Sequence, residues 1–442
     1  MTASRLLLAG GTVVFADGAR RADILVEDAR IAAVAEHLDA PGGAIVLDAS
    51  GCAVGPGLVD LHAHLREPGS EEAETIESAS RAAAYGGYTA VVAMPNTDPA
   101  CDSASVVADV YQRSRLAHCE VAVAGAITKG REGTALAPMA EMAELGVRIF
   151  TDDGTGVQDG DLMRRALEYA KGLGVTLAQH CEDASLAAGG VMHEGRWSSM
   201  LGLRGQPALA ETSMVARDLG LVELTGATMH FLHLSVPASV RLVQEARLAG
   251  QPVTCEVAPH HLTFDDARCA TYSPLWKVNP PLRPEAMVAE LRGLLRDGAF
   301  DAVATDHAPH PPEAKDRTFD DAPPGMLGLQ HALGATVEAL GGVDGLDLVA
   351  LFSLLSRRPA AIARLREADE RSAGHSPQGG DLLVGSVANL CVVDLDDAHE
   401  CTPHSILSRS GNSPYVGRRL AVSVRHTLLR GIPTKRDGEV VA

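Results

Sequence analysis

The stretch Gly-Pro-Gly-Leu-Val-Asp-Leu-His-Ala-His-Leu-Arg, residues 55–66, runs from small and apolar residues into a His-x-His-x-Arg pattern. Successive side chains of a β-strand point to opposite faces, so His62, His64 and Arg66 would project to the same side. Two imidazoles about 6–7 Å apart along one strand can bind one metal ion. A His-x-His pair is equally compatible with core or surface histidines, so the metal interpretation depends on the rest of the chain.

The chain that follows this stretch alternates short apolar runs with longer segments of helical spacing, such as 74–85 and 162–172. Continuous apolar strands that alternate with helices imply a parallel sheet covered by helices. Eight such units over about 250 residues predict a (β/α)8 barrel of the TIM type. A doubly wound open sheet is the alternative, because periodicity does not establish closure. The predicted strands are 57–64, 88–94, 120–127, 147–151, 175–180, 228–233, 253–258 and 302–306.

Both ends of the chain read as short strands rather than as βα units. Residues 5–54 contain a hairpin-like pattern around 27–30, and strands resume at 382–386, 389–394 and 421–429. Helical segments are expected at 346–357 and 360–368, separated by Pro359. A Ser-, Gly- and Pro-rich linker is expected at 371–380. We therefore predict a barrel at 55–370 and one small discontinuous β-sandwich domain made from 1–54 and 371–442.

The bulk composition excludes several classes of function. The 442 residues contain 38 Lys and Arg against 57 Asp and Glu, a net charge of −19. This balance argues against a nucleic-acid-binding or anionic-membrane surface, and an anionic substrate would need local positive charge. The eight cysteines form no C-x-x-C pair, and no signal-like start or membrane-length apolar run is seen. We expect reduced thiols and a cytoplasmic location.

Metal-binding residue types collect where five of the eight predicted strands end. Catalytic residues of such barrels gather at the carboxyl ends of the strands. Four imidazoles with at least two carboxylates suit zinc or a similar divalent ion, and two ions sharing a bridging carboxylate and a hydroxide would use them all. The chemistry this predicts is metal-assisted hydrolysis or its reverse. The residues are His62 and His64, then Asp152 or Asp153 (which strand alternation leaves open), His180, His233 and Asp306.

Several motifs resemble those of the dihydroorotases, within the cyclic amidohydrolase superfamily, and the resemblance extends over essentially the whole chain. They are DLHAHLREPG at 60–69, AMPNT at 93–97, FTDDG at 150–154, VNPPLR at 278–283 and ATDHAPH at 304–310. The match is to the class I type, in which an aspartate bridges two metal ions.

The resemblance implies a role for each site residue. His62 and His64 would hold one zinc ion, His180 and His233 a second, and Asp153 would bridge them. Asp306 would ligate the first ion and act as general acid–base. The side chains of Arg66, Asn96, Asn279 and His310 would bind the substrate carboxylate and ring, with the backbone of Pro324 and Gly325 over the ring.

The implied reaction is the reversible cyclisation of N-carbamoyl-L-aspartate to L-dihydroorotate, in de novo pyrimidine (UMP) biosynthesis. The implied partners are this small-molecule substrate, a second copy of the chain in a homodimer, and aspartate transcarbamoylase. Physical chemistry supports the substrate assignment, because an arginine offers a two-pronged donor for a carboxylate and asparagines pair with amide edges. The Pro- and Gly-rich stretch 310–328 is long enough to form a lid.

Each assignment has a plainer alternative. Arg66 can instead form a structural salt bridge with Glu67 or an aspartate, Asn96 can cap the next helix, and His310 can be a loop histidine without a ligand. The rival function is a hydantoinase or allantoinase, whose bridge would be a carboxylated lysine, with Lys129 as the candidate. A catalytically silent homologue would have lost metal ligands, and here all are present. One departure, Gly-Leu-Gln-His at 328–331 where the family often has Gly-Leu-Glu-Thr, predicts a change in local packing.

Overall fold

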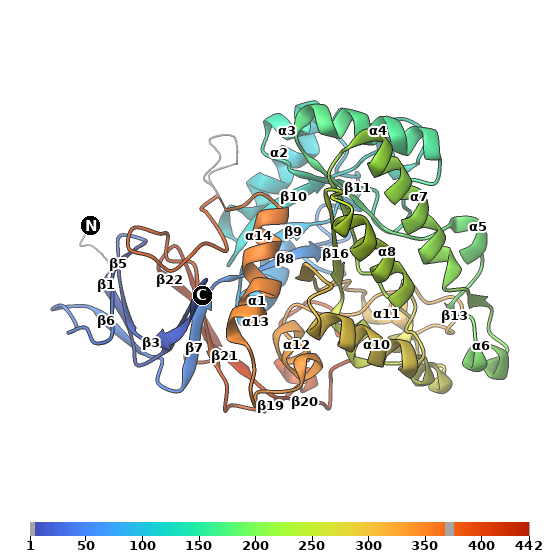
Figure 1. The fold of residues 1–442 in the computed structure, drawn as a ribbon. Coiled ribbons are helices and arrows are strands. Elements are labelled where there is room, and N and C mark those ends of the chain that lie inside the picture. Colours follow the sequence, from blue (N-terminus) through green and yellow to red (C-terminus); the bar gives the residue numbers. More distant parts are fainter. Residues whose placement is uncertain (1–4, 367–374, 442) are drawn as a thin grey trace.

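A computed structural model of the chain describes residues 5–366 and 375–441, and its larger part is a barrel (Figure 1). Eight parallel strands lie in one sheet in chain order, and a parallel bridge between Ala63 and His307 joins its two edges. The predicted (β/α)8 barrel is therefore confirmed, and the open doubly wound sheet is wrong. The strands are β8 (Leu58–Ala63), β9 (Tyr88–Ala93), β10 (Glu120–Gly125), β11 (Ile149–Thr151), β12 (Thr176–Gln179), β15 (Met229–Phe231), β16 (Val253–Val257) and β17 (Ala302–Val303).

Amphipathic helices cover the outer face of the barrel (Figure 1). Their ends follow local sequence signals: the Thr75 hydroxyl caps α1 through Ser78, and Asp159 caps α4, which ends at Gly174 with a φ of 66°. The longer helices are α1 (Ile76–Tyr85), α2 (Ala104–Arg113), α4 (Gly160–Leu173), α7 (Leu209–Thr225), α8 (Pro237–Leu248), α10 (Glu285–Arg296) and α12 (Ala332–Leu340). Shorter ones are α3 (Met139–Glu144), α5 (Ala184–Ala187), α6 (Arg196–Leu201), α9 (Pro259–Thr263) and α11 (Pro312–Lys315).

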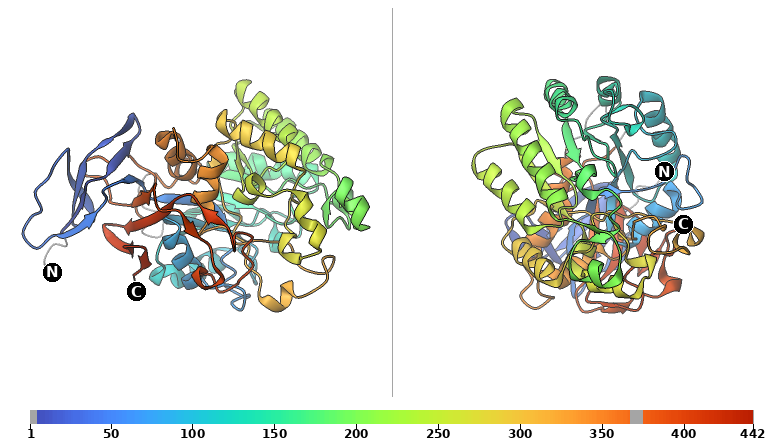
Figure 2. Two further views of the ribbon diagram at one scale, coloured as in Figure 1. Left: turned by 90° about the horizontal axis from the view of Figure 1, so that it is seen from below. Right: turned by 90° about the vertical axis from the view of Figure 1, so that its right-hand side faces the viewer.

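The two chain ends build a smaller β-sandwich beside the barrel, as predicted (Figures 1 and 2). In its seven-stranded sheet, β7 (Cys52–Pro56) from the N-terminal part pairs antiparallel with β18 (Leu390–Asp394) from the C-terminal part. Apolar side chains of both sheets, such as Leu8, Ile24, Val54 and Leu390, form its separate core. One sheet contains β1 (Arg5–Ala9), β4 (Asp23–Glu27), β5 (Arg30–Ala35) and β6 (Ile45–Asp48). The other contains β2 (Thr12–Phe15), β3 (Gly18–Arg21), β7 (Cys52–Pro56), β18 (Leu390–Asp394), β21 (Ser423–Leu429), β22 (Ile432–Arg436) and β23 (Glu439–Val440).

The domain limits at residues 54 and 370 stay a prediction, and positions 371–374 of the predicted linker lie outside the described residues. The break predicted at Pro359 is wrong. Helix α13 (Leu348–Phe352) continues through a π-turn at Ser353–Arg357 into α14 (Arg358–Ile362). A wider turn directly before the proline accommodates its missing amide hydrogen. The helix ends at Ile362, and residues 367–368 of the second predicted segment are also outside the described part.

The carboxyl ends of the barrel strands lie on the side away from the β-sandwich, where α5 and α6 follow β12 (Figure 1). The connection after β12 extends this end through α5, α6 and the short pair β13 (Met192–His193) and β14 (Gly205–Gln206). The C-terminal part of the chain also returns to the barrel, where a second short pair, β19 (His399–Glu400) and β20 (Arg419–Leu420), brackets residues 401–418. All eight cysteines are buried and unpaired. Among the described residues, no helix is long and apolar enough to span a membrane.

Candidate metal and substrate site

The four predicted histidines meet around Asp153 at the carboxyl end of the barrel. His62 Nε2 and His64 Nε2 lie 3.4 and 3.5 Å from Asp153 Oδ2. His180 Nδ1 and His233 Nε2 each lie 3.5 Å from the other oxygen, Oδ1. Within each group of three residues the ligand atoms lie within 4.8 Å of one another, and all are buried. Each carboxylate oxygen therefore faces its own pair of imidazoles, the geometry that a bridging ligand between two metal ions requires.

Asp306 lies on the side of the first histidine pair. Its Oδ1 is 3.2 Å from His64 Nε2 and 3.6 Å from His62 Nε2. The backbone of Asp306 has a positive φ of 45°, and His233 and Arg66 have values of 31° and 62°. Residues other than glycine rarely adopt this left-handed backbone conformation, because it costs conformational energy. Such residues are concentrated at functional sites. The strand ends thus bend sharply at three of the predicted site residues.

The pKa values in this cluster reflect the attraction between the Asp153 carboxylate and the imidazoles of His62 and His180, whereas burial lowers the pKa of His64. Burial alone would lower the pKa of His62, but Asp153 and Glu256 hold it well above its ordinary value. Burial would raise the pKa of Asp153, but His62, His180 and His233 hold it well below its ordinary value. Against burial, Asp153 and Glu182 raise the pKa of His180 to about 10. Metal ligation requires neutral imidazoles, so an ion that binds here must displace protons.

Two unpartnered polar atoms of the cluster support metal binding. His62 Nε2 and Asp153 Oδ1 are buried and have no hydrogen-bond partner among the described residues. A buried polar atom without a partner costs free energy, and such atoms at functional sites call for a specific explanation. Nitrogen and carboxylate donors without thiolate are a suitable ligand set for a divalent ion such as zinc. The residues present therefore fit a metal centre.

The neighbouring Asp152 has a different environment, which separates the two aspartates that strand alternation could not. Its carboxylate accepts hydrogen bonds from the backbone amides of Ile127 and Thr128, at 2.8 and 3.0 Å, and from the Thr128 hydroxyl. Because β11 ends at Thr151, both aspartates follow the strand, and the turn after it decides their directions. Asp152 fastens this turn to the end of β10, and Asp153 faces the histidines.

His62, His64 and His180 also have polar partners at the ring nitrogen that points away from Asp153, and the sequence analysis missed most of these partners. His64 Nδ1 lies 2.8 Å from Asn96 Oδ1, and His62 Nδ1 lies 3.1 Å from Glu256 Oε1. Glu182 lies 3.8 Å from His180 Nε2. The signal for Glu256 was present in the sequence, since it is the one charged residue of an otherwise uncharged buried strand, β16. The capping alternative for Asn96 does not hold, because α2 begins eight positions later with Ser103 as its N-cap.

A cavity of about 190 Å³ opens directly onto the predicted ligands. Lys129, the candidate for a carboxylated bridge, is exposed, and no lysine is found among the described residues that line the cavity. The lining does include all six predicted substrate-binding residues: Arg66, Asn96, Asn279, His310, Pro324 and Gly325. The structure therefore brings the six predicted substrate-binding residues together around one cavity.

Arg66 and His310 both line this cavity, and they differ in charge. Arg66 Nε donates to the carbonyl of Pro309 at 3.1 Å, and Glu67 pairs instead with Arg113 at 2.9 Å, so the Arg66–Glu67 alternative is wrong. Burial lowers the pKa of Arg66 to about 10, which leaves it charged at neutral pH. Burial and the nearby Arg66 lower the pKa of His310 to about 3, which keeps this imidazole neutral.

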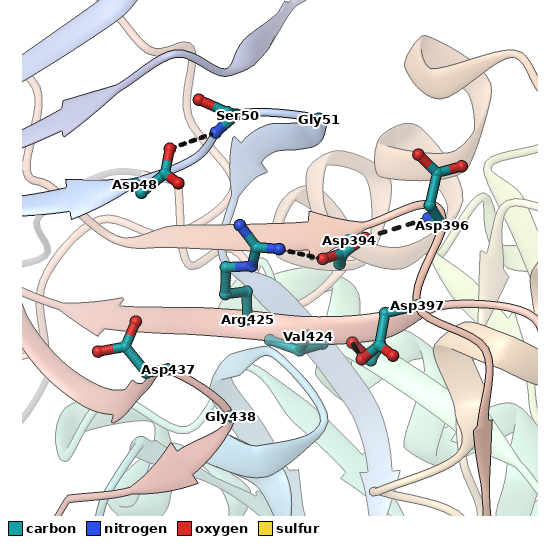
Figure 3. A pocket seen from close by; sticks show the side chains of 11 residues that line it. Asp48, Ser50, Gly51, Asp394, Asp396, Asp397, Val424, Arg425, Asp437 and Gly438 are labelled. Carbon is teal, nitrogen blue, oxygen red and sulfur yellow. Dashed lines mark hydrogen bonds and ion pairs between the residues drawn. The ribbon is translucent and has the colours of Figure 1, made fainter.

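A larger cavity, about 590 Å³, lies in the β-sandwich and has a different character (Figure 3). Its acidic lining includes Asp48, Asp396, Asp397 and Asp437, and its one arginine, Arg425, is paired with Asp394. No histidine is found among the described residues that line this cavity, so these residues do not provide the ligand set of the barrel site.

Known proteins resemble this chain in sequence and in fold. The family model described as "Dihydro-orotase-like" matches residues 51–239. A dihydroorotase from Mycobacterium tuberculosis is 46% identical over 425 residues, 96% of each chain. One from Streptomyces coelicolor is 43% identical over 440 residues, which cover 99% of this chain and 100% of the relative.

Among solved structures, an L-hydantoinase from Arthrobacter aurescens matches with a TM-score of 0.87 and 26% identity, covering 99% of this chain and 97% of its own. The fold is thus shared with hydantoinases, whereas the sequence is far nearer to the dihydroorotases. Taken with the site geometry, these similarities show that the chain belongs to the dihydroorotase family of cyclic amide hydrolases.

Proposed function

We propose that the chain catalyses the reversible conversion of L-dihydroorotate to N-carbamoyl-L-aspartate, a reaction of de novo pyrimidine biosynthesis. The main support for this proposal is the shared cavity, which is lined both by the half-buried Arg66 and by the Asp153-centred cluster. A cyclic amide with a carboxylate substituent needs both features, one for the reacting carbonyl and one for the fixed negative charge.

Two zinc ions are the metal complement that the ligand set supports. His62, His64 and Asp306 would hold the first, His180 and His233 the second, and Asp153 would contribute one oxygen to each. When bound, such ions lower the pKa of water and polarise the amide carbonyl. Metal analysis of the purified protein should find two zinc ions per chain, and the loss of Asp153 should affect both.

Asp306 is the proposed proton carrier. In ring opening, water adds to the amide carbonyl and the bond from that carbon to the ring nitrogen breaks. The proton lost by the water must reach the leaving nitrogen, and a carboxylate can accept it and pass it on. Asp306 has a pKa held below its ordinary value by His64, His62 and His233, against burial, so its carboxylate is ionised and has oxygen lone pairs for the proton. Cyclisation follows the same steps in reverse.

The remaining polar groups orient the ring. Arg66 would pair with the substrate carboxylate. Asn96 Oδ1 already lies against His64, which leaves its Nδ2 for a ring oxygen. His310 Nε2 donates to the Pro324 carbonyl at 2.8 Å, so Nδ1 of the neutral imidazole remains as an acceptor for a ring N–H.

A ring-opening assay on purified protein tests this function. Dihydroorotate should be hydrolysed, activity should be lost on chelation, and zinc should restore it. Hydantoin, which lacks the carboxylate, should react at least ~100-fold more slowly, because the charge of Arg66 would then be buried without its partner. Efficient hydrolysis of hydantoin, with no turnover of dihydroorotate after metal is restored, would instead establish the hydantoinase alternative.

Assembly is a separate proposal, implied by the family resemblance. A homodimer would be seen by light scattering during size exclusion. A complex with aspartate transcarbamoylase would elute earlier than either enzyme alone, and separate elution would contradict it. The cytoplasmic location stays a prediction.

A further inference from the structure

Asn412, far from the barrel strands in sequence, reaches the wall of the substrate cavity. Its side chain is buried, with 6% of its surface exposed. Its Nδ2 donates to the carbonyls of Ala308 and Gly325, at 3.0 and 3.1 Å, and its Oδ1 accepts from the His310 amide at 3.1 Å. Both amide hydrogens and the amide oxygen are therefore used by one small region.

The three partners belong to the two arms of the loop 308–326, which lines the cavity. Ala308, His310 and Gly325 all line it, and the arms run side by side, with the Ala308 amide donating to Met326 at 2.8 Å. The arms are also tightly packed: a Cβ on Gly325, whose φ is 146°, would lie 2.8 Å from His310 Nε2. A small shift of either arm would therefore move the groups proposed to hold the ring.

The segment that carries Asn412 is anchored to the barrel by bonds of its own. Ser410 Oγ donates to the Ala73 carbonyl at 2.6 Å, and the Arg409 amide donates to Glu74 Oε1 at 2.9 Å. The Ser408 hydroxyl also contacts Glu74, a fully buried carboxylate. Asn412 thus projects from a fixed support, so its side chain can set the position of the loop arms.

We propose that Asn412 is a positioning residue for substrate binding, which holds His310 and Gly325 at the distance that the ring requires. The inference rests on the proposed function, since it assumes that these two residues contact the substrate. Among the described residues, the hydrogen bonds of the Asn412 side chain go to Ala308, His310 and Gly325 and to none of the metal ligands, so we expect it to act on how the ring is bound and not on the metal centre. A purely structural asparagine would affect the stability of the fold without changing affinity for the substrate.

The chain provides a matched control in Asn389. This asparagine is also buried, donates to Ser376 Oγ and the Pro377 carbonyl at 2.9 Å each, and accepts from the Arg430 amide at 2.7 Å. It has the same three-bond pattern but lies in the β-sandwich. Loss of either side chain leaves comparable buried groups without partners, so the two variants should lose similar thermal stability.

The experiment compares Asn412→Ala, Asn412→Asp and Asn389→Ala as zinc-loaded enzymes. Asn412→Asp keeps the size and the acceptor but replaces both donors with an oxygen that faces two carbonyls. Both Asn412 variants should raise KM for dihydroorotate about tenfold with kcat within about threefold, the pattern expected when binding common to ground and transition states is lost. Zinc content should stay unchanged, and Asn389→Ala should lower Tm while KM remains that of the wild type.

An unchanged KM in either folded Asn412 variant would overturn the inference. The same holds if Asn389→Ala raises KM equally, because the effect would then be one of general stability. Should Asn412→Ala fail to fold, the isosteric Asn412→Asp decides alone. Failure of the proposed function is distinguishable, since wild-type enzyme would then not turn over dihydroorotate at all.

Discussion

His62 Nδ1 lies 3.1 Å from Glu256 Oε1, and both side chains are fully buried in the barrel. The other oxygen of Glu256 lies 3.0 Å from His230 Nε2, and His230 Nδ1 lies 2.8 Å from Thr254 Oγ1. A carboxylate in this position fixes the proton of His62 on Nδ1. In the neutral form of the ring, which a bound metal ion requires, Nε2 is then the unprotonated nitrogen, and it faces Asp153.

The variant Glu256→Gln should weaken zinc binding on the order of 10–100-fold, because the amide orients His62 less strongly and makes it a poorer donor. Competition with a chelating indicator measures this without reference to activity. Glu120→Gln is the control: Glu120 is also buried but bonds to Ser376 and Arg430, away from the cluster. It should leave zinc affinity unchanged. Equal affinities for Glu256→Gln and the wild type would show that the contact does not tune the metal site.

Replacing Asp306 with asparagine should separate catalysis from metal binding. The variant keeps His62, His64 and Asp153 around the first ion but cannot carry a proton, so kcat should fall about 10²–10⁴-fold while most zinc is retained. Steady-state kinetics and metal analysis of the same preparation measure both. Asp152→Asn, one position from the bridge but bonded to Ile127 and Thr128 just after β10, should lose stability and keep its kcat. Normal turnover by Asp306→Asn would refute the proton-carrier assignment.

Arg66→Lys tests recognition of the substrate carboxylate. A lysine keeps the charge but not the planar fork, so KM for dihydroorotate should rise at least ~10-fold. Hydantoin serves as the internal control, because it has no carboxylate and its slow hydrolysis should change little. If both substrates lose activity equally, Arg66 supports the fold of the site through its bond to Pro309 and does not select the substrate.

Strand periodicity predicted the barrel well because each strand carries its own apolar signal, and the ends of those strands located all the predicted metal ligands. Side-chain direction after a strand end is a different problem. Asp152 and Asp153 differ only in how a short turn points them, which neither alternation nor composition encodes. Only family resemblance separated them before the structure did.

Contacts between segments far apart in the chain could not be predicted from the sequence either. Asn412 lies more than 80 positions from each of its three partners, and the pairing exists only because the C-terminal segment folds back over the barrel. The role of Glu256 was easier to predict from the sequence, because a lone acidic residue in a buried strand needs a polar partner. The continuation of the helix through Pro359 reflects packing that overrides a local signal.

Lys435 should make the stability of the β-sandwich depend on pH. Its ammonium is buried, donates to the Tyr85 carbonyl at 3.0 Å and lies 3.4 Å from the centre of the Tyr85 ring. Burial lowers the pKa of Lys435 to about 7, whereas the unfolded chain keeps the ordinary value of 10.5. Between these values the unfolded state binds more protons, so the contribution of Lys435 to the free energy of unfolding rises with pH and is lowest below pH 7.

The variant Lys435→Met removes this titration. Its free energy of unfolding relative to the wild type should fall by about 1 kcal/mol for each pH unit between 7 and 10, and it should be constant below pH 7. Urea denaturation of both proteins at pH 6, 7.5, 9 and 10 measures the difference, in which all other titrating groups cancel. Lys129→Met, at an exposed position, should give a flat difference over the same range. A flat difference for Lys435→Met as well would mean that the Tyr85 carbonyl and ring keep the ammonium charged inside the fold.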